Sequence, residues 1–435
     1  MNKTKLTILF ILLLIPACSL DKKTSIWKEK VNVEEQKEVK IKKLFRPKKV
    51  LEKELNPTLI INLKDAIIKK EKDFNLDNNF GRINFEKFLN KTSNYKFSKI
   101  SNFDKNEANI LFYKNDLIFF ENKGSLIRID KNFKQVWKFN HYSKVEKKSE
   151  PFLLLSNNID TLVIADNISK FYAVNINNGN LIWSRSNSSP FNSEIKIYKD
   201  NFYVVDFENI LHCFSLKDGK EIWSFKTENV LIKSQKNLSI VIDNNIVFFN
   251  NSLGDITALK ADDGKLIWQL PTQNDGIFAQ SFSLKNSDLV LDDKKVYFSN
   301  NRNEFYSIDS ETGSLNWQKN INSYVRPVII DNIIITISTE GFLIIIDKLS
   351  GKIIRATDVF DVFKKKKRTE IYPIEFTVGL ENIYLTTSNG RLLILNIKNG
   401  KTKKIIKIDN NKISRPFIKK NILYIVKDNS IIRFD

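Results

Sequence analysis

The chain has 435 residues and a formal net charge of +20, with 42% hydrophobic and 11% aromatic residues. This length ordinarily indicates two or three domains, but a closed array of repeats can use it as one. The two cysteines, Cys18 and Cys213, exclude a disulfide framework once Cys18 is modified as argued next. Cys213 lies in the apolar run LHCFSL, which predicts a small buried hydrophobic side chain.

The first residues have the pattern of an export signal. Lys3 and Lys5 precede an apolar run from Leu6 to Ile15, which is too short to span a bilayer as a helix. The following Ile-Pro-Ala-Cys resembles a bacterial lipobox, so residues 1–17 are predicted to be a signal peptide and Cys18 an acylated N-terminus. Ser19 after the cysteine favours the periplasmic face of the outer membrane. An ordinary secretory signal with an incidental cysteine is the alternative.

Residues 18–79 are predicted to be the acylated N-terminus and a flexible tether. The segment is rich in lysine and glutamate, lacks a period-2 pattern and is interrupted by Pro47 and Pro57. The pattern LIINLKDAIIKK favours a short amphipathic helix around Leu59–Lys70.

The rest of the chain, residues 80–435, repeats one short phrase. A strand-like run with a polar end leads into a turn, usually with glycine, and then into a strand that carries tryptophan in five copies: Trp137, Trp183, Trp223, Trp268 and Trp317. The polar ends of the third strands recur at Asp130, Asn175, Ser215, Lys260, Asp309, Asp347, Asn396 and Asp435. A period of about 40 to 50 residues built of short strands predicts an all-β, eight-bladed β-propeller of four-stranded antiparallel blades.

The eighth repeat supplies only three strands before the chain ends at Asp435. The segment Asn94–Ile100 alternates Tyr95 and Phe97 with polar residues, so it is predicted to add the missing strand and close the last blade. The tryptophans are predicted to pack between neighbouring blades. The alternative, a platform that stacks on a sugar or quinone, would need them on one exposed face.

The phrase strand–Asp–x–x–x–Gly–Lys–x–x–Trp resembles the pyrroloquinoline-quinone (PQQ)-like repeat over about residues 94–435. Together with the lipobox, the array resembles the BamB-like lipoproteins of outer-membrane β-barrel assembly. This resemblance implies a non-enzymatic scaffold without a cofactor. Such a scaffold binds the periplasmic domains of the barrel-forming subunit BamA, and unfolded outer-membrane proteins are further partners.

The resemblance also places a partner-binding site after Trp223, at Val230, Ile232 and Lys233. Lysine stands where the family has arginine, which keeps the charge but loses the bidentate fork. The Asp-x-Asp pair of the family's following loop is not matched in FSLKNSDLVLDD. Ordinary burial in a strand is the alternative for Val230 and Ile232.

Other functions are less well supported by the residues. A quinone-dependent dehydrogenase would need a catalytic carboxylate, a calcium cage and neighbouring cysteines, and this sequence has no such cysteine pair. His141 and His212 have no Cys or His at metal spacing and are predicted to be structural. The basic run Lys364–Arg368 could track phosphates, but an export signal removes the chain from nucleic acid. We therefore expect this run to be a solvated loop, or to contact lipopolysaccharide or an acidic partner. A periplasmic propeller lipoprotein of another envelope complex is the second functional hypothesis.

Overall fold

The computed structural model describes residues 53–69, 78–87, 89, 91–105, 109–228, 234, 236–272 and 284–434. All of them belong to the unit Lys48–Asp435, and the description below concerns this unit alone. Within these ranges, no helix has the length and apolar character needed to cross a membrane.

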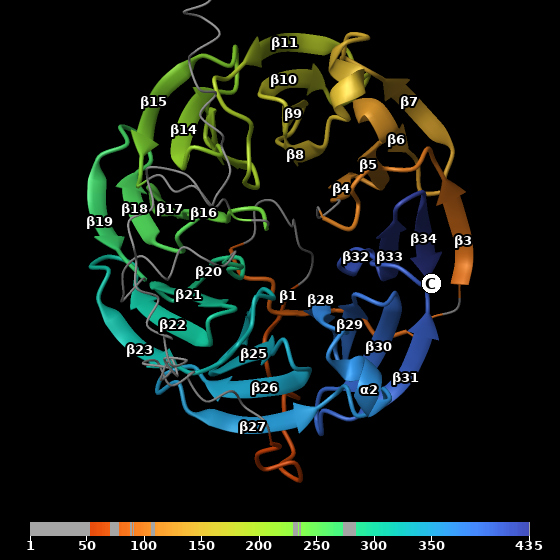
Figure 1. The fold of residues 1–435 in the computed structure, drawn as a ribbon, viewed down its shortest axis with the longest axis vertical. Coiled ribbons are helices and arrows are strands. Elements are labelled where there is room, and N and C mark those ends of the chain that lie inside the picture. The colour runs from red at the N-terminus through yellow and green to blue at the C-terminus, as the bar shows by residue number, and fades with distance from the viewer. Residues whose placement is uncertain are drawn as a thin grey trace, which may run out of the picture. The chain divides into compact units, whose positions relative to one another are not determined.

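Eight four-stranded antiparallel blades stand around a common centre (Figure 1). Blades 1 to 4 consist of β4 (Leu111–Tyr113), β5 (Asp116–Glu121), β6 (Ser125–Ile129) and β7 (Gln135–Phe139); β8 (Leu153–Asn157), β9 (Thr161–Asp166), β10 (Lys170–Asn175) and β11 (Leu181–Ser186); β12 (Lys196–Tyr198), β13 (Asn201–Val205), β14 (Ile210–Ser215) and β15 (Glu221–Lys226); and β16 (Ile240–Asp243), β17 (Ile246–Asn250), β18 (Ile256–Lys260) and β19 (Leu266–Leu270). The predicted eight-bladed β-propeller is confirmed.

Blades 5 to 8 consist of β20 (Val290–Asp292), β21 (Lys295–Asn300), β22 (Glu304–Asp309) and β23 (Leu315–Lys319); β24 (Val328–Ile330), β25 (Ile333–Ile337), β26 (Phe342–Asp347) and β27 (Ile353–Asp358); β28 (Pro373–Val378), β29 (Asn382–Thr387), β30 (Arg391–Asn396) and β31 (Thr402–Lys407); and β32 (Phe417–Lys419), β33 (Ile422–Lys427), β34 (Ser430–Phe434) and β3 (Lys91–Lys96). The remaining elements are the 3₁₀ turns η1 (Asn122–Gly124) and η2 (Glu146–Ser149), the one-turn helix α2 (Lys365–Arg368), and two short strands, β1 (Ile68–Lys69) and β2 (Arg82–Ile83).

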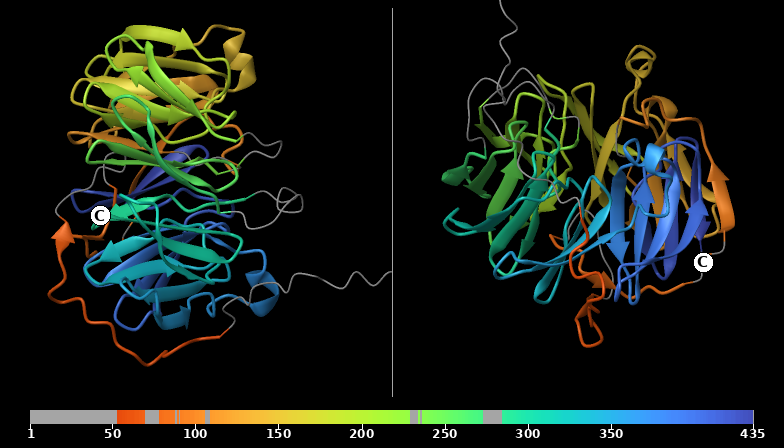
Figure 2. Two further views of the ribbon diagram at one scale, coloured as in Figure 1. Left: turned by 90° about the vertical axis from the view of Figure 1, so that its left-hand side faces the viewer. Right: turned by 60° about the horizontal axis from the view of Figure 1, so that its bottom comes forward.

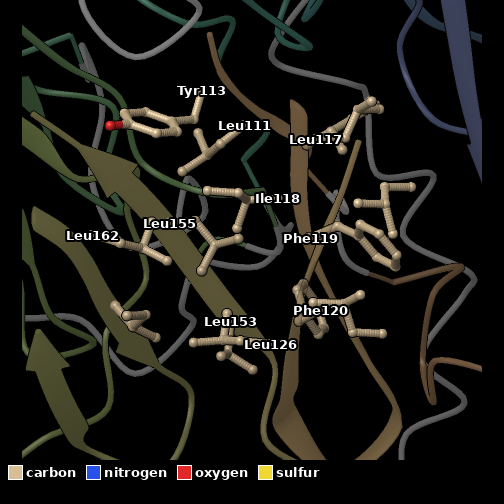
Figure 3. Close-up of a cluster of buried hydrophobic side chains, with 14 of the residues drawn as sticks. Leu111, Tyr113, Leu117, Ile118, Phe119, Phe120, Leu126, Leu153, Leu155 and Leu162 are labelled. Carbon is tan, nitrogen blue, oxygen red and sulfur yellow. The ribbon is translucent and has the colours of Figure 1, made fainter. Parts of the chain in front are cut away.

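The first strand of each blade faces the centre, and the fourth lies at the rim (Figure 1). The middle strands are apolar and buried because both of their faces pack on neighbouring blades, whereas rim strands such as β11 and β15 are largely exposed. Figure 3 shows one such interface, in which Leu111 and Ile118 of blade 1 lie near Leu153 and Leu155 of blade 2. The core is therefore a series of similar contacts between blades.

The tryptophans connect each of blades 1 to 5 to the next blade, as the sequence predicted. Each indole N–H donates to a carbonyl that follows the third strand of the next blade, at 2.9–3.2 Å: Trp137 to Ile176, Trp183 to Leu216, Trp223 to Ala261, Trp268 to Ser310 and Trp317 to Lys348. The ring also lies close under the turn glycine of that blade. A Cβ on Gly351, whose φ is +67°, would lie 2.6 Å from Trp317, so both backbone conformation and space require glycine there.

The last blade receives its fourth strand from far earlier in the chain. β3 pairs antiparallel with β34, with Tyr95 opposite Ile431 and Lys96 opposite Ser430. The sequence placed this strand at residues 94–100, whereas the structure has it at Lys91–Lys96. The rings of Tyr95 and Phe97 lie 5.7 and 5.2 Å from that of Phe119 in blade 1, so this segment contacts both ends of the array.

Residues 53–69 and 78–87, here called the strap, lie on the propeller. The sequence assigned most of them to a flexible tether, but Leu55 forms an antiparallel bridge with Ala356 on the rim strand β27. Farther along, Ile61 and Leu63 join the apolar cluster of blades 6 and 7. The amphipathic helix expected around Leu59–Lys70 is absent from residues 59–69, which contain one turn and the short strand β1. Pairing with the propeller satisfies this backbone instead of an internal helix.

Candidate functional site

The blade topology gives the ring two different faces. The links between second and third strands, and the connections from one blade to the next, lie on what we call the connection face. The turns between first and second strands and between third and fourth strands lie on the opposite turn face. Loops on a rigid scaffold are the usual carriers of binding function, so each face is a separate candidate surface.

The centre of the ring is filled by paired charges near the connection face. Asp288, before β20, receives Lys236 Nζ at 2.9 Å, Arg415 Nη2 at 3.5 Å and Arg326 Nη1 at 4.0 Å. Burial alone would raise the pKa of Asp288, but these three cations hold it well below its ordinary value. The carboxylate is therefore charged and engaged with blades 4, 6 and 8.

Glu375 of β28 extends this network to blade 7. Its carboxylate accepts the backbone N–H of Arg326 at 3.1 Å and lies 4.0 Å from Arg415. Glu375 and Arg326 are both almost completely buried. Removing one member of this buried network would leave another buried charge unpaired and would destabilise the fold. The network is therefore a structural connection between blades.

The strap closes the same centre from the turn face. Asn78 bonds to Ile242 and Leu291, and Asn79 bonds to Ile329, so two residues reach the inner strands of blades 4, 5 and 6. β2 then pairs with blade 7 through Arg82 and Val378. Figure 1 shows this part of the chain, beside β1 and β28, near the middle of the ring.

Phe80 completes the filling of the centre. Its ring is buried and lies 3.7 Å from the guanidinium carbon of Arg326, a cation–π contact. The strap thus meets the charge network directly. The charge network and Phe80 thus engage each other at the centre, and the loops of the two faces are the other candidate working surface.

The histidines have structural surroundings. His212 is buried and bridges two carboxylates, with Nε2 3.1 Å from Asp206 and Nδ1 2.7 Å from Glu221. His141 Nε2 bonds to the carbonyl of Gly179 at 3.2 Å. Within the described part of the chain, no three His, Cys, Asp or Glu residues are placed to hold a metal ion.

Cys213 is buried, as the sequence predicted. Burial raises the pKa of its thiol to about 12, so the group stays protonated and is a poor nucleophile.

The predicted site residues lie outside the described residues. This holds for the acylation site Cys18 and for Val230, Ile232 and Lys233. The last three belong to the connection from β15 to β16, and its described neighbours Glu228 and Ser234 flank them. The described ends of this connection, Glu228 and Ser234, belong to the connection face.

The basic run Lys364–Arg368 also belongs to the connection face. It lies between β27 and β28, and Lys365–Arg368 form α2. Its four lysines are exposed, while Arg368 is half-buried. In the two views of Figure 2, α2 rises from one face of the ring and the orange strap crosses the other.

Several solved structures share this architecture. BamB from Moraxella catarrhalis matches with a TM-score of 0.63 and 15% identity, over 80% of this chain and 99% of that one. Quinohemoprotein alcohol dehydrogenase from Comamonas testosteroni matches with a TM-score of 0.61 and 9% identity, over 81% and 78% of the chains. The computationally designed protein Ika8 matches at 0.58 and 12%, over 78% and 99%. No curated protein matches by sequence.

The fold and the repeat define an eight-bladed β-propeller of PQQ-like repeats. Solved structures with this fold include both BamB and an alcohol dehydrogenase, so the fold alone does not specify a function. The sequence model of the family described as outer membrane protein assembly factor BamB matches residues 122–357, more than half of the chain. The chain belongs to this family.

Proposed function

We propose that this protein is a lipid-anchored, non-catalytic scaffold of the machinery that assembles outer-membrane β-barrel proteins. The observation that carries the proposal is the family match over residues 122–357. In this role, loops of the rigid ring dock the periplasmic domains of the barrel-forming subunit BamA, and acylated Cys18 keeps the complex at the periplasmic face of the outer membrane.

The filled centre supports a scaffold rather than a reaction site. Asp288 and Glu375 are the buried carboxylates of the shaft, and both are occupied by Arg326, Arg415 or Lys236. Cys213 is a protonated, buried thiol. The two carboxylates at the centre are therefore engaged in ion pairs or hydrogen bonds between blades.

The position of the strap favours the connection face as the docking face. The strap covers the centre of the turn face and part of this face at blades 6 and 7. At blade 7, Glu86 accepts the backbone N–H of Glu381 at 3.0 Å. The described ends of the β15–β16 connection, Glu228 and Ser234, belong to the other face, and Val230, Ile232 and Lys233 between them in sequence are the proposed contact with the partner.

Binding of the mature protein to the immobilised periplasmic domains of the barrel-forming subunit tests this proposal. We expect Val230→Asp with Ile232→Asp to weaken binding at least tenfold, because a central apolar contact is replaced by unpaired charge. The control carries Ile159→Asp and Leu349→Asp, which are 81% and 78% exposed in turns of the turn face. We expect this control to bind like the wild type.

Absence of binding by the folded wild-type protein would contradict the proposed partner. Capture of a different envelope subunit from periplasmic extract would support the second functional hypothesis. Equal loss of binding in both double variants would contradict the proposed docking surface at the β15–β16 connection.

A further inference from the structure

The loop between β27 and β28 presents a concentrated positive charge to solvent. Lys364–Lys367 are exposed, and none of them forms an ion pair with a carboxylate in the described part of the chain. The carboxylates Asp361 and Glu370 flank the run in sequence without pairing with it. Four adjacent cations therefore repel one another here, and no described carboxylate pairs with them.

The base of this loop is fixed to the propeller. Phe360 is completely buried and packs edge-on against Phe363, with ring centres 5.5 Å apart. Arg368 turns inward, donating to Asp358 at 2.8 Å and to the carbonyl of Phe363 at 3.0 Å. The arginine therefore anchors the loop, while the lysines remain free to contact something outside.

Apolar side chains accompany the lysines at the surface. Val362 is 40% exposed and Tyr372 is 36% exposed. The Tyr372 ring lies 6.4 Å from that of Tyr324, and Lys285 Nζ lies near both rings, at 5.9 and 5.4 Å. Lysines mixed with an aliphatic and an aromatic side chain are typical of segments that lie at the boundary of a lipid surface.

The N-terminal part of the chain enters the structure beside this loop. Glu54 accepts the backbone N–H of Asp358 at 3.1 Å, and Asp358 is also the partner of Arg368. Leu55 pairs with Ala356, which lies two residues before Asp358 on β27. The described chain therefore begins at the base of the basic loop, and the predicted acylation site Cys18 precedes it in sequence.

We infer that the basic loop, residues 360–372, rests on an anionic lipid surface. The inference goes beyond protein docking, and only the argument from the N-terminal chain rests on the proposed acylation of Cys18. The observations favour lipid over an acidic protein for two reasons. The exposed cations are lysines, which suit diffuse charge better than directional carboxylate pairing. The loop also rises from its face, as Figure 2 shows, and so can approach a flat surface.

Each lysine near an anionic membrane strengthens binding by about fivefold, and salt screens this attraction. The mature chain carrying Cys18→Ser removes the acyl anchor and isolates the contribution of the loop. We expect it to sediment with vesicles of phosphatidylcholine and phosphatidylglycerol at low salt, and not with phosphatidylcholine alone. Replacing Lys364–Lys367 with glutamine should weaken sedimentation at least tenfold.

A matched control changes the same number of charges elsewhere. Lys401, Lys403, Lys404 and Lys407 are exposed on and beside the rim strand β31, and their replacement with glutamine should weaken vesicle binding no more than threefold. Circular dichroism should show both variants folded. A second variant, Val362→Ser with Tyr372→Ser, should weaken vesicle binding while leaving net charge unchanged.

Three outcomes would overturn the inference. They are no binding of the Cys18→Ser chain to phosphatidylglycerol vesicles, equal losses in the two lysine variants, and loss of binding to the barrel-forming subunit without loss of vesicle binding. The last result would make the loop a protein contact. Retained partner binding in the loop variant with lost vesicle binding would support the lipid contact and leave the proposed function untouched.

Discussion

The guanidinium of Arg355 occupies the position that tryptophan takes in other blades. It is paired with Ile345 in β26 as Trp317 is paired with Ser307 in β22. Like the indole, it donates to the carbonyl after the next third strand, here Ile397 at 3.2 Å. It also donates to the carbonyls of Leu59 and Lys398, so the loss of tryptophan in blade 6 coincides with the docking of the strap.

Arg355→Met should destabilise the fold and loosen the strap. The change removes the Arg355 donor from the carbonyls of Ile397 and Leu59, whereas Lys398 keeps the N–H of Ile61. We expect this loss to lower the free energy of unfolding by roughly 2–4 kcal/mol. Chemical denaturation measures this loss, and limited proteolysis between residues 53 and 63 reports on the strap. The comparison variant Arg355→Trp should recover much of the stability by restoring the bond to Ile397, yet remain cleavable because Leu59 lacks a donor. Resistance of both variants to cleavage would show that Arg355 does not hold the strap.

His212 gives blade 3 a dependence on pH. Burial alone would lower its pKa, but the hydrogen bonds to Asp206 and Glu221 raise it above the ordinary value. A raised pKa means that the folded state holds the proton more tightly than the unfolded state. The stabilisation is therefore complete below the unfolded pKa, near 6.5, and is lost as the pH rises through the folded value.

His212→Gln should remove this dependence. The free energy of unfolding of the wild type, minus that of the variant, should be largest at acidic pH and fall as the pH rises past about 6.5. Urea denaturation between pH 5 and 9 measures both proteins. His141→Gln is the control, because burial lowers the pKa of His141 and its partner is a backbone carbonyl. A difference that grows with pH would contradict the assignment.

At the scale of elements, β3 is the strand with the most distant partner. It is joined to β34 by backbone pairing over more than 300 residues of chain, and its Tyr95 and Phe97 pack on Phe119 of blade 1. Without β3, β34 would expose its outer edge, and blade 1 would lose aromatic contacts.

Deleting residues 94–100 should lower the thermal unfolding temperature of the whole ring by at least several degrees. The deletion removes the pairing of Tyr95 and Lys96 and the contact of Phe97 with Phe119. Differential scanning calorimetry of the deletion variant measures the effect, and a chain starting at residue 53, which keeps both strap and β3, is the control. An unchanged unfolding temperature would mean that β3 adds nothing to the stability of the ring.

At the scale of the whole molecule, the blades could be predicted because their information is local. The repeated polar ends fall within one residue of the ends of the described third strands from Ile129 to Asn396. The packing of the tryptophans between blades could also be predicted, because a large aromatic side chain that recurs in successive repeats is usually buried.

The strap could not be predicted in this way. Residues 53–87 have no period-2 pattern, and their contacts join Asn78 to Ile242 and Leu55 to Ala356, which no local rule connects. The sequence feature that points to the strap is Arg355, a charged residue at the position where five repeats have tryptophan. The charge network was missed for a related reason: Asp288 and Arg415 are ordinary loop residues in sequence and meet only across the closed ring.

The order in which the strap meets the ring has a mechanical consequence. From the N-terminal side, the chain contacts blade 6 first, through Leu55 and Ala356, then the centre, and only afterwards reaches β3 at blade 8. A tensile load applied upstream of residue 53 is therefore taken up at the outer rim of blade 6. The seam between β3 and β34 stays unloaded until every earlier contact has peeled away.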